Sequence, residues 1–265
     1  MTNQEYHARP EISKSDLDLM AQSPLHYKNK KLKEQTPNML LGSVVHKLVL
    51  EPMDFDNEFA IAPVVDKRTK IGKETLEKFI STLGNKAVVE ADIFDVARDM
   101  ANEVLAMRQT ALFLKNGKAE QSYFSQIDDV KVKCRPDFYN EDLGLIVDLK
   151  TTAGASAKDF SSSVAKFNYH VQAAFYTDIL KSLGLKANKF LFIAVESKAP
   201  YYVGFYTLDD EALELGRTTY KKLLALYKWC VENDNFFGYA KKEDDNLNFI
   251  QTLSLPTYKF YENIA

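Results

Sequence analysis

Three charged residues in the segment CRPDFYNEDLGLIVDLKTT (residues 134–152) are spaced for joint chemistry. Leu145, Val147 and Leu149 are apolar at every second position, which predicts a strand over 145–152. Its other face then carries Asp148 and Lys150 side by side. Asp137 follows another strand-like run and reaches the same place if the two strands form a hairpin through 140–144. Charges at the end of a buried strand are costly unless they pair or bind a ligand.

Two neighbouring carboxylates repel each other, and either a raised pKa or a bound divalent cation relieves the repulsion. Lys150 adds a compact positive charge that can neutralise a phosphate oxygen. Carboxylates, a metal ion and a lysine together favour hydrolysis of a phosphodiester bond. The plainer alternative is an ordinary Asp–Lys pair on a surface hairpin.

The composition is that of an ordinary globular protein, with 265 residues, 46% hydrophobic and 27% charged. This length accommodates one large domain or two small ones. A net charge of −3 does not indicate nucleic-acid binding, so any DNA contact must depend on local basic runs and on metal. Each candidate run could equally be a solvated face. The runs are Lys28, Lys30, Lys31 and Lys33, and Lys67, Arg68, Lys70 and Lys73.

Several cofactor and partner classes find no support in the sequence. Cys134 and Cys230 are too few for a disulfide framework or an Fe–S cluster. There is no G-x-x-x-x-G-K-[ST] motif, so we expect no ATP-driven step. No run approaches about 18 apolar residues, so we expect no membrane partner and a cytoplasmic location.

The elements that must position these residues follow from periodicity and capping signals. Residues 1–12 are expected to be a loose arm, and helices are predicted over 13–20, 23–33, 39–51, 73–83, 92–114, 169–183 and 209–232. Strands are predicted over 119–127, 130–139, 145–152, 189–196 and 201–207, with a further strand possible near 55–63. The central order is therefore helix, three strands, helix, strand (αβββαβ).

The motif R-P-D, followed by D-L-K with its Asp eleven residues after the first, resembles the signature of the PD-(D/E)XK nucleases. More closely, the chain resembles the C-terminal nuclease domain of the exodeoxyribonuclease VIII (RecE) family of phage and prophage nucleases. The resemblance covers most of the chain, and GSVVH (42–46) is similar to the early His motif of RecB-type nucleases. The matching stretches are CRPD (134–137), VDLKTT (147–152), YHVQAAFYTD (169–178) and TLSLP (252–256).

The resemblance implies an α/β (α+β) fold with a restriction-endonuclease-like core: a mixed sheet flanked by helices, with an N-terminal helical extension. It implies one nuclease domain over 1–265. Within it, 1–88 would be mainly helical, 89–208 the catalytic core, and 209–265 a C-terminal helix and tail.

The resemblance also implies which residues bind metal. Asp137, Asp148 and the main-chain carbonyl of Leu149 would be ligands of one or two Mg²⁺ or Mn²⁺ ions, which prefer oxygen ligands. His46 would join them, and Glu120 resembles a further acidic position near such sites. A lone His among apolar residues is also a common structural residue, and charged residues at strand starts are common.

The remaining roles concern the substrate. Lys150 would orient the attacking water or stabilise the negative charge that develops on the phosphate. Gln172 and Tyr176 match a Q-x-x-x-Y motif; their i,i+4 spacing puts both on one helix face, where they would support the site, contact the DNA backbone, or only pack. Ser15, with Ser13 and Ser23, resembles serines that contact DNA phosphates, although helix capping already explains Ser13 and Ser23.

The activity implied by the resemblance is a Mg²⁺-dependent, ATP-independent 5′→3′ exonuclease acting on double-stranded DNA ends. It would release mononucleotides and leave a 3′ single strand for an annealing recombinase of the RecT type. A homo-oligomeric ring such as a tetramer, in the cytoplasm of a bacterial cell, is the expected assembly. Two alternatives stay open: a structure-specific or Cas4-like nuclease, and a DNA-binding module with an inactive nuclease fold.

Overall fold

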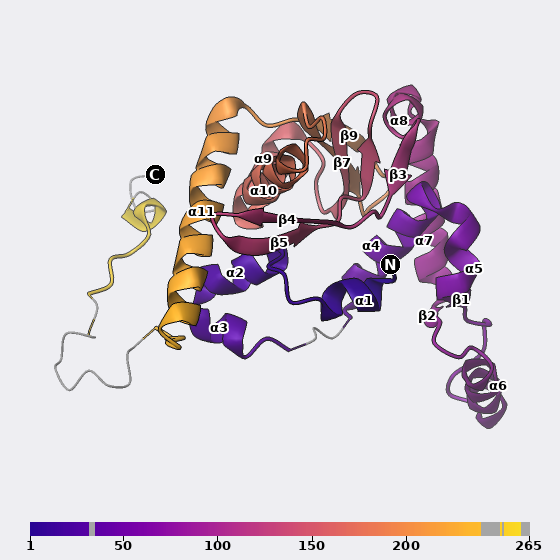
Figure 1. Ribbon diagram of the computed structural model, residues 1–265. Helices are drawn as coiled ribbons and strands as arrows, with labels where there is room; N and C mark the ends of the chain where they lie inside the picture. Colours follow the sequence, from indigo (N-terminus) through magenta and orange to yellow (C-terminus); the bar gives the residue numbers. More distant parts are fainter. Residues whose placement is uncertain (32–34, 240–249, 251, 261–265) are drawn as a thin grey trace.

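The computed structural model describes residues 1–31, 35–239, 250 and 252–260 (Figure 1). At its centre is a five-stranded sheet with the order β3-β6-β7-β8-β9. The β7–β8 pair is parallel and the other three pairs are antiparallel, so the sheet is mixed. The strands are β3 (Gly117–Ala119), β6 (Phe138–Asn140), β7 (Leu145–Thr152), β8 (Lys189–Glu196) and β9 (Val203–Tyr206).

Helices cover both faces of this sheet. Leu145, Val147 and Leu149 of β7 pack in one apolar cluster with α4 (Pro37–Leu50) and α7 (Ala91–Ala106). Ile146, on the opposite face, packs in a second cluster with α10 (Tyr169–Ser182) and α11 (Asp210–Glu232). The predicted alternation of β7 and the predicted fold class, a mixed sheet flanked by helices, are both confirmed.

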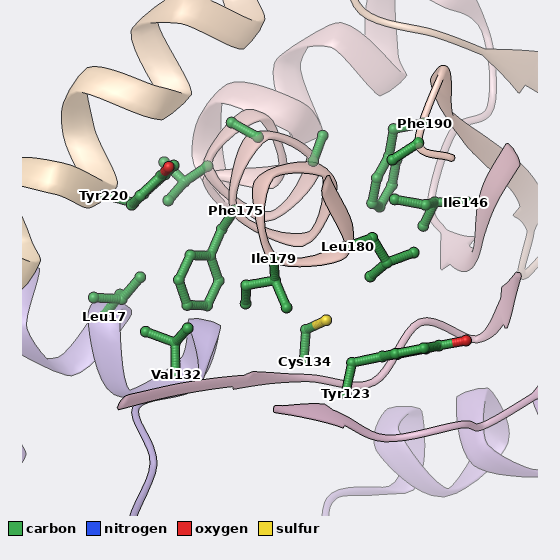
Figure 2. Packing of buried hydrophobic residues seen from close by; sticks show 14 of the residues in the cluster. Leu17, Tyr123, Val132, Cys134, Ile146, Phe175, Ile179, Leu180, Phe190 and Tyr220 are labelled. Atoms are coloured by element: carbon green, nitrogen blue, oxygen red, sulfur yellow. The ribbon is translucent and has the colours of Figure 1, made fainter. Parts of the chain in front are cut away.

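The second cluster surrounds α10, which lies between the sheet and three other elements. Figure 2 shows Phe175 and Ile179 of α10 pointing toward Val132 and Cys134 from β5 and Leu17 from α2. Tyr220 from α11 lies beside Phe175, and Leu180 lies on the side of Ile146 and Phe190. Ile179, Leu180 and Phe175 have no exposed surface. Because α10 is held on several sides, the side chains on its first turns have fixed positions relative to β7.

Two strands predicted as continuous are each divided in the structure. The predicted strand 119–127 becomes β3 and β4 (Tyr123–Ile127), and the predicted strand 130–139 becomes β5 (Val130–Cys134) and β6. The chain bends at Glu120, whose φ of 49° is left-handed, and at Pro136, which has no N–H for a ladder bond. As a result β4 and β5 leave the central sheet and form their own antiparallel pair.

The N-terminal arm is not loose as predicted, because it contains α1 (Asn3–Ala8). Thr2 and Glu5 form a capping box, and the Tyr6 side chain is buried. Ile12 then forms a parallel bridge with Val132 of β5. The next two helices, α2 (Lys14–Gln22) and α3 (Pro24–Lys28), begin at the expected serine caps.

Two helical regions also differ from the prediction. The single helix predicted over 92–114 is interrupted at Met107, which separates α7 from α8 (Arg108–Phe113). The helix α9 (Ala157–Lys166) was not predicted, although Phe160 and Val164 have helical i,i+4 spacing and both pack in the second cluster; Ser156 caps its start.

Residues 52–89 form an extension beside α4. It contains a 3₁₀ turn η1 (Pro52–Asp54), α5 (Phe55–Glu58), β1 (Phe59–Ile61), α6 (Lys70–Ser81) and β2 (Ala87–Val89). β1 and β2 pair in parallel, and α6 projects away from the body of the molecule (Figure 1). A 3₁₀ turn η3 (Thr257–Phe260) follows near the C-terminus. Lys33, and residues 240–249, 251 and 261–265 of the predicted tail, lie outside the described residues, whereas the TLSLP motif (252–256) lies within them.

In the part of the chain that the structure describes, no helix is both long and apolar enough to cross a membrane.

Candidate active site

Three residues from distant parts of the sequence meet at the turn that connects β5 to β6 of the central sheet. His46 comes from α4, Glu120 directly follows β3, and Asp137 directly precedes β6. One ligand atom from each lies within 4.8 Å of the others. His46 Nδ1 is 3.5 Å from Asp137 Oδ2. An imidazole nitrogen and two carboxylate oxygens at this spacing can hold a metal ion together.

Backbone hydrogen bonds fix the Asp137 carboxylate and the main chain of Glu120. The Leu149 N–H donates to Asp137 Oδ2 at 2.7 Å, which ties Asp137 to the centre of β7. The Glu120 N–H donates to the Asp137 main-chain oxygen at 3.1 Å, and the left-handed backbone at Glu120 turns the chain there. Glu120 therefore depends on the β3–β6 pairing for its position, and Asp137 on the β6–β7 pairing.

The close approach of α4 to the sheet brings His46 to this place. At Gly42 a Cβ atom would lie 3.3 Å from Thr151 Oγ1 on β7, which leaves little room for a side chain. His46 is one helical turn further along α4. The glycine of the GSVVH motif thus lets the helix bring its histidine to the two carboxylates.

Asp148 and Lys150 form the other half of the site, on the α10 side of β7. Asp148 has 1% exposed surface, and its Oδ2 lies 2.6 Å from Lys150 Nζ. Gln172 of α10 donates from Nε2 to Asp148 Oδ1 at 2.5 Å. The Lys150 ammonium also lies 4.7 Å from the centre of the Tyr169 ring.

Burial dominates the electrostatics of the site, and repulsion between its acids adds to it. Burial, and next the charge of Asp137, raise the pKa of Glu120 to about 8. Burial also raises the pKa of Asp148 to about 6, although the Lys150 ammonium opposes this change and Asp137 adds to it. For Lys150, burial alone would lower the pKa, but Asp148 and Asp137 outweigh it and the pKa is raised. The charged forms of Glu120 and Asp148 are therefore destabilised in the folded chain.

These features fit a hard divalent cation. The donor set is rich in carboxylate oxygen, and Asp148 Oδ2 is buried without a hydrogen bond of its own, although Lys150 lies beside it. His46, Glu120 and Asp137 would hold the ion, and a cation beside them would lower both raised carboxyl pKa values. Asp148 is outside this group of three, since its two oxygens face Gln172 and Lys150.

The structure places the other predicted residues at different distances from this centre. Tyr176 lies on α10 one turn beyond Gln172 and packs against Phe190; burial raises its pKa well above the usual value, with smaller contributions from Asp148 and Asp137. Ser15 is exposed on the first turn of α2, and its hydroxyl is 2.9 Å from Ser13 Oγ. The Leu149 N–H contacts the site, and metal binding by its carbonyl stays a prediction.

A cleft of about 1040 Å³ opens beside His46 and Glu120. The base of the 52–89 extension, α1 and α4 line it, and it contains the cationic groups of Arg135, Lys47 and Lys86. Lys47 is paired with Glu51 and Glu58, whereas Arg135 donates to Ser122 Oγ at 2.7 Å and lies 4.3 Å from the Tyr6 ring. The cleft is large enough for part of a nucleic-acid strand.

Reasoning from the sequence missed Tyr169 and Arg135. Tyr169 precedes Gln172 by three residues, which places it on the same helix face, and this spacing could have revealed it. Arg135 is part of the R-P-D motif itself.

Comparisons with known proteins agree with this geometry. Residues 12–244 match the family described as a PDDEXK-like domain of unknown function (DUF3799). A crystal structure of a protein described as a "putative exonuclease" from Eubacterium rectale is similar, with a TM-score of 0.61 and 16% sequence identity over 97% of this chain and 95% of that chain. The crystal structure of SSO0001 matches 70% of this chain and 88% of that chain at 15% sequence identity, with a TM-score of only 0.29. No curated protein matches the chain.

The family match covers most of the chain, and the similar crystal structure supports the fold. The narrower resemblance to exodeoxyribonuclease VIII stays a prediction. The chain belongs to the DUF3799 family of PDDEXK-like domains, and its fold is that of a PD-(D/E)XK nuclease.

Proposed function

We propose that the chain is a metal-dependent DNA exonuclease that degrades one strand of a duplex from its 5′ end without ATP. The observation that carries the proposal is the convergence of His46, Glu120 and Asp137 within 4.8 Å, next to the buried Asp148–Lys150 pair. The similarity to a crystal structure described as an exonuclease supports the choice of exonuclease. Polarity and the absence of an ATP requirement rest on the resemblance of the motifs.

In this function each half of the site has its own role. His46, Glu120 and Asp137 would hold Mg²⁺ or Mn²⁺, and the ion would supply Lewis acidity toward the phosphate and a lowered pKa for bound water. Lys150 Nζ, held at 2.6 Å by Asp148, supplies positive charge for a non-bridging phosphate oxygen. Gln172 keeps the Asp148 carboxylate in place through its hydrogen bond to Oδ1.

The assembly and partners belong to the same proposal. A homo-oligomeric ring would enclose the duplex and explain how a chain with a net charge of −3 stays on DNA. The 3′ single strand left by the enzyme would be the substrate of an annealing recombinase. If adding salt to a preformed complex on long DNA releases it at once, the ring is wrong.

The experiment that tests the function uses a linear duplex labelled at either the 5′ or the 3′ end and a closed circle, with Mg²⁺ and without ATP. We expect early release of the 5′ label as a mononucleotide, with the circle intact. Early release of the 3′ label would reverse the polarity. Cutting of the circle would assign the chain to the endonucleases, and cleavage of neither substrate in Mg²⁺ or Mn²⁺ would refute nuclease activity.

A further inference from the structure

An aromatic stack leads from the core to the surface beside Lys150. Phe192 has no exposed surface, and the Tyr169 ring stacks on it at 5.9 Å with an angle of 29°. Phe167 stacks in turn on Tyr169 at 5.6 Å with an angle of 28°, and 48% of its surface is exposed. The three rings are thus nearly parallel to their neighbours, and the last one is open to solvent. The exposed part of the Phe167 ring contributes no hydrophobic stabilisation to the fold, because it is not removed from water.

The backbone holds Phe167 firmly in this position. It ends α9, where its N–H donates to the Ser163 oxygen at 2.9 Å. Asn168 follows with a left-handed φ of 53° and leads directly into α10. Lys14 Nζ of α2 donates to the Phe167 oxygen at 2.9 Å, so three helices fix the residue. Because it is fixed, binding a flat ligand on Phe167 costs little ordering of the protein.

Three lysines lie beside the stack, two of them paired with acids. Lys150 Nζ lies 4.7 Å from the centre of the Tyr169 ring and is paired with Asp148, and Lys14 Nζ lies 5.9 Å from the ring and is paired with Asp18 at 2.8 Å. Lys166 Nζ lies 5.3 Å from the Phe167 ring on an exposed side chain, and it has no ion pair within the described part of the chain. It can therefore turn toward a phosphate when another group takes its place on the ring. Aromatic rings beside a row of ammonium groups are the arrangement that binds single-stranded nucleic acid, since bases stack and phosphates pair with the cations.

We propose that Phe167, supported from behind by Tyr169, is a base-stacking platform for the nucleotide next to the phosphate that the site cleaves. The inference rests on the proposed nuclease function and specifies its substrate: a strand end whose base has left the duplex. Contacts of 4.7 and 5.6 Å lead from the Lys150 ammonium through Tyr169 to Phe167, so a phosphate at Lys150 brings its neighbouring base to the platform. A base removed from its pair is stabilised here at the moment of cleavage.

The test places 2-aminopurine at each of the last four positions of the 5′-ended strand of a duplex and measures its fluorescence with the wild-type chain in Ca²⁺. We expect strong quenching at one position and its loss in Phe167→Ala. The Kd of a short single strand should rise about 10-fold in this variant, as for the loss of one stacked base. Phe167→Trp should restore both signals. Trp229→Ala, which removes an aromatic residue of similar exposure (44%) on α11, should change neither.

The outcomes separate this inference from the function on which it rests. If the wild-type chain cleaves DNA but Phe167→Ala retains the quenching and the Kd, the platform is wrong and the nuclease stands. If Phe167→Trp fails to restore a loss seen in Phe167→Ala, stacking is not the cause and the inference also fails. If the wild-type chain neither binds nor cleaves DNA, both proposals fall.

Discussion

Replacing Glu120 by Gln should stabilise the metal-free protein at alkaline pH while weakening its metal binding. The Glu120 carboxylate lies within 4.8 Å of an Asp137 ligand oxygen, and its surroundings raise its pKa from 4.5 to about 8. The folded chain binds the Glu120 proton more tightly than the unfolded chain does. The stabilisation that this protonation provides is therefore complete below pH 4.5 and is lost as the pH rises through about 8. The isosteric amide has no charge to lose or to be repelled.

Two estimates give magnitudes of the same order. The change in the pKa of Glu120, whose main cause is burial, corresponds to a cost on the order of 5 kcal/mol above pH 8. Coulomb repulsion between two unit charges at 4.8 Å, the upper limit of the separation between the Glu120 and Asp137 ligand atoms, is about 3.5 kcal/mol with an effective dielectric of about 20. The amide introduced by Glu120→Gln would lack full hydrogen bonding, which reduces the gain in stability by about 1–2 kcal/mol. We therefore expect a net gain of about 2–3 kcal/mol, or about 4–6 °C in Tm for a chain of this size.

The assay is thermal unfolding of wild type and Glu120→Gln in EDTA at pH 5 and pH 8.5, repeated at pH 8.5 with Mg²⁺. The difference in Tm should be small at pH 5 and largest at pH 8.5 without metal. Adding Mg²⁺ should raise the Tm of the wild type more than that of the variant, because the ion binds the folded site. Glu103→Gln, which removes an exposed charge on α7, is the matched control and should change Tm little under any condition. A variant equal to or less stable than wild type at pH 8.5 in EDTA would refute the reasoning.

Three further predictions concern single contacts. Asp148→Asn should reduce metal-dependent cleavage of the end-labelled duplex at least about 1,000-fold, since the amide cannot hold the Lys150 ammonium at 2.6 Å; full activity would overturn the assignment of the site. Lys150→Ala should lose about 100- to 1,000-fold in turnover while calorimetry still detects metal binding, and loss of metal binding would contradict its role toward the phosphate. Asp178→Ala should lower the free energy of unfolding in urea by about 2–3 kcal/mol. Asp178 of α10 accepts hydrogen bonds from Arg217 Nε (2.7 Å) and the Tyr220 hydroxyl (2.6 Å) of α11, and the variant removes both. As a control, Glu214→Ala, at an exposed position, should cost under about 0.5 kcal/mol.

The sequence predicted those parts of the fold whose pattern is local. The period of two in β7 correctly separated Asp148 and Lys150 from Leu149. The i,i+4 spacing put Gln172 and Tyr176 on one face of α10 but did not say where that face points; the structure directs Gln172 to Asp148. The capped helix α1 was missed because six residues are too few to show a period. The helix α9 was missed although Phe160 and Val164 have the spacing of an amphipathic helix.

The candidate metal group depends on contacts that no local pattern contains. Glu120 was predicted on a strand, but it follows β3 in a left-handed bend and contacts Asp137 only because β3 pairs with β6. The predictions that Glu120 and His46 lie near Asp137 came from motif resemblance, and the structure does bring them together. Their roles as ligands stay predictions until metal binding is measured.

The N-terminal helices complete the site and are not only an accessory to the nuclease core. α4 contributes His46 to the metal group, and Gly42 allows the approach that places it there. α2 contributes Lys14, which fixes the Phe167 backbone and lies over Tyr169. Lys150 and the aromatic stack lie on the α10 side of β7, and α4 completes the candidate metal group. The two halves of the site are close enough to interact, because the charge of Asp137 contributes to the raised pKa values of both Asp148 and Lys150. In the proposed function, a cation held by the three candidate ligands and the Lys150 ammonium would therefore act on the same phosphate.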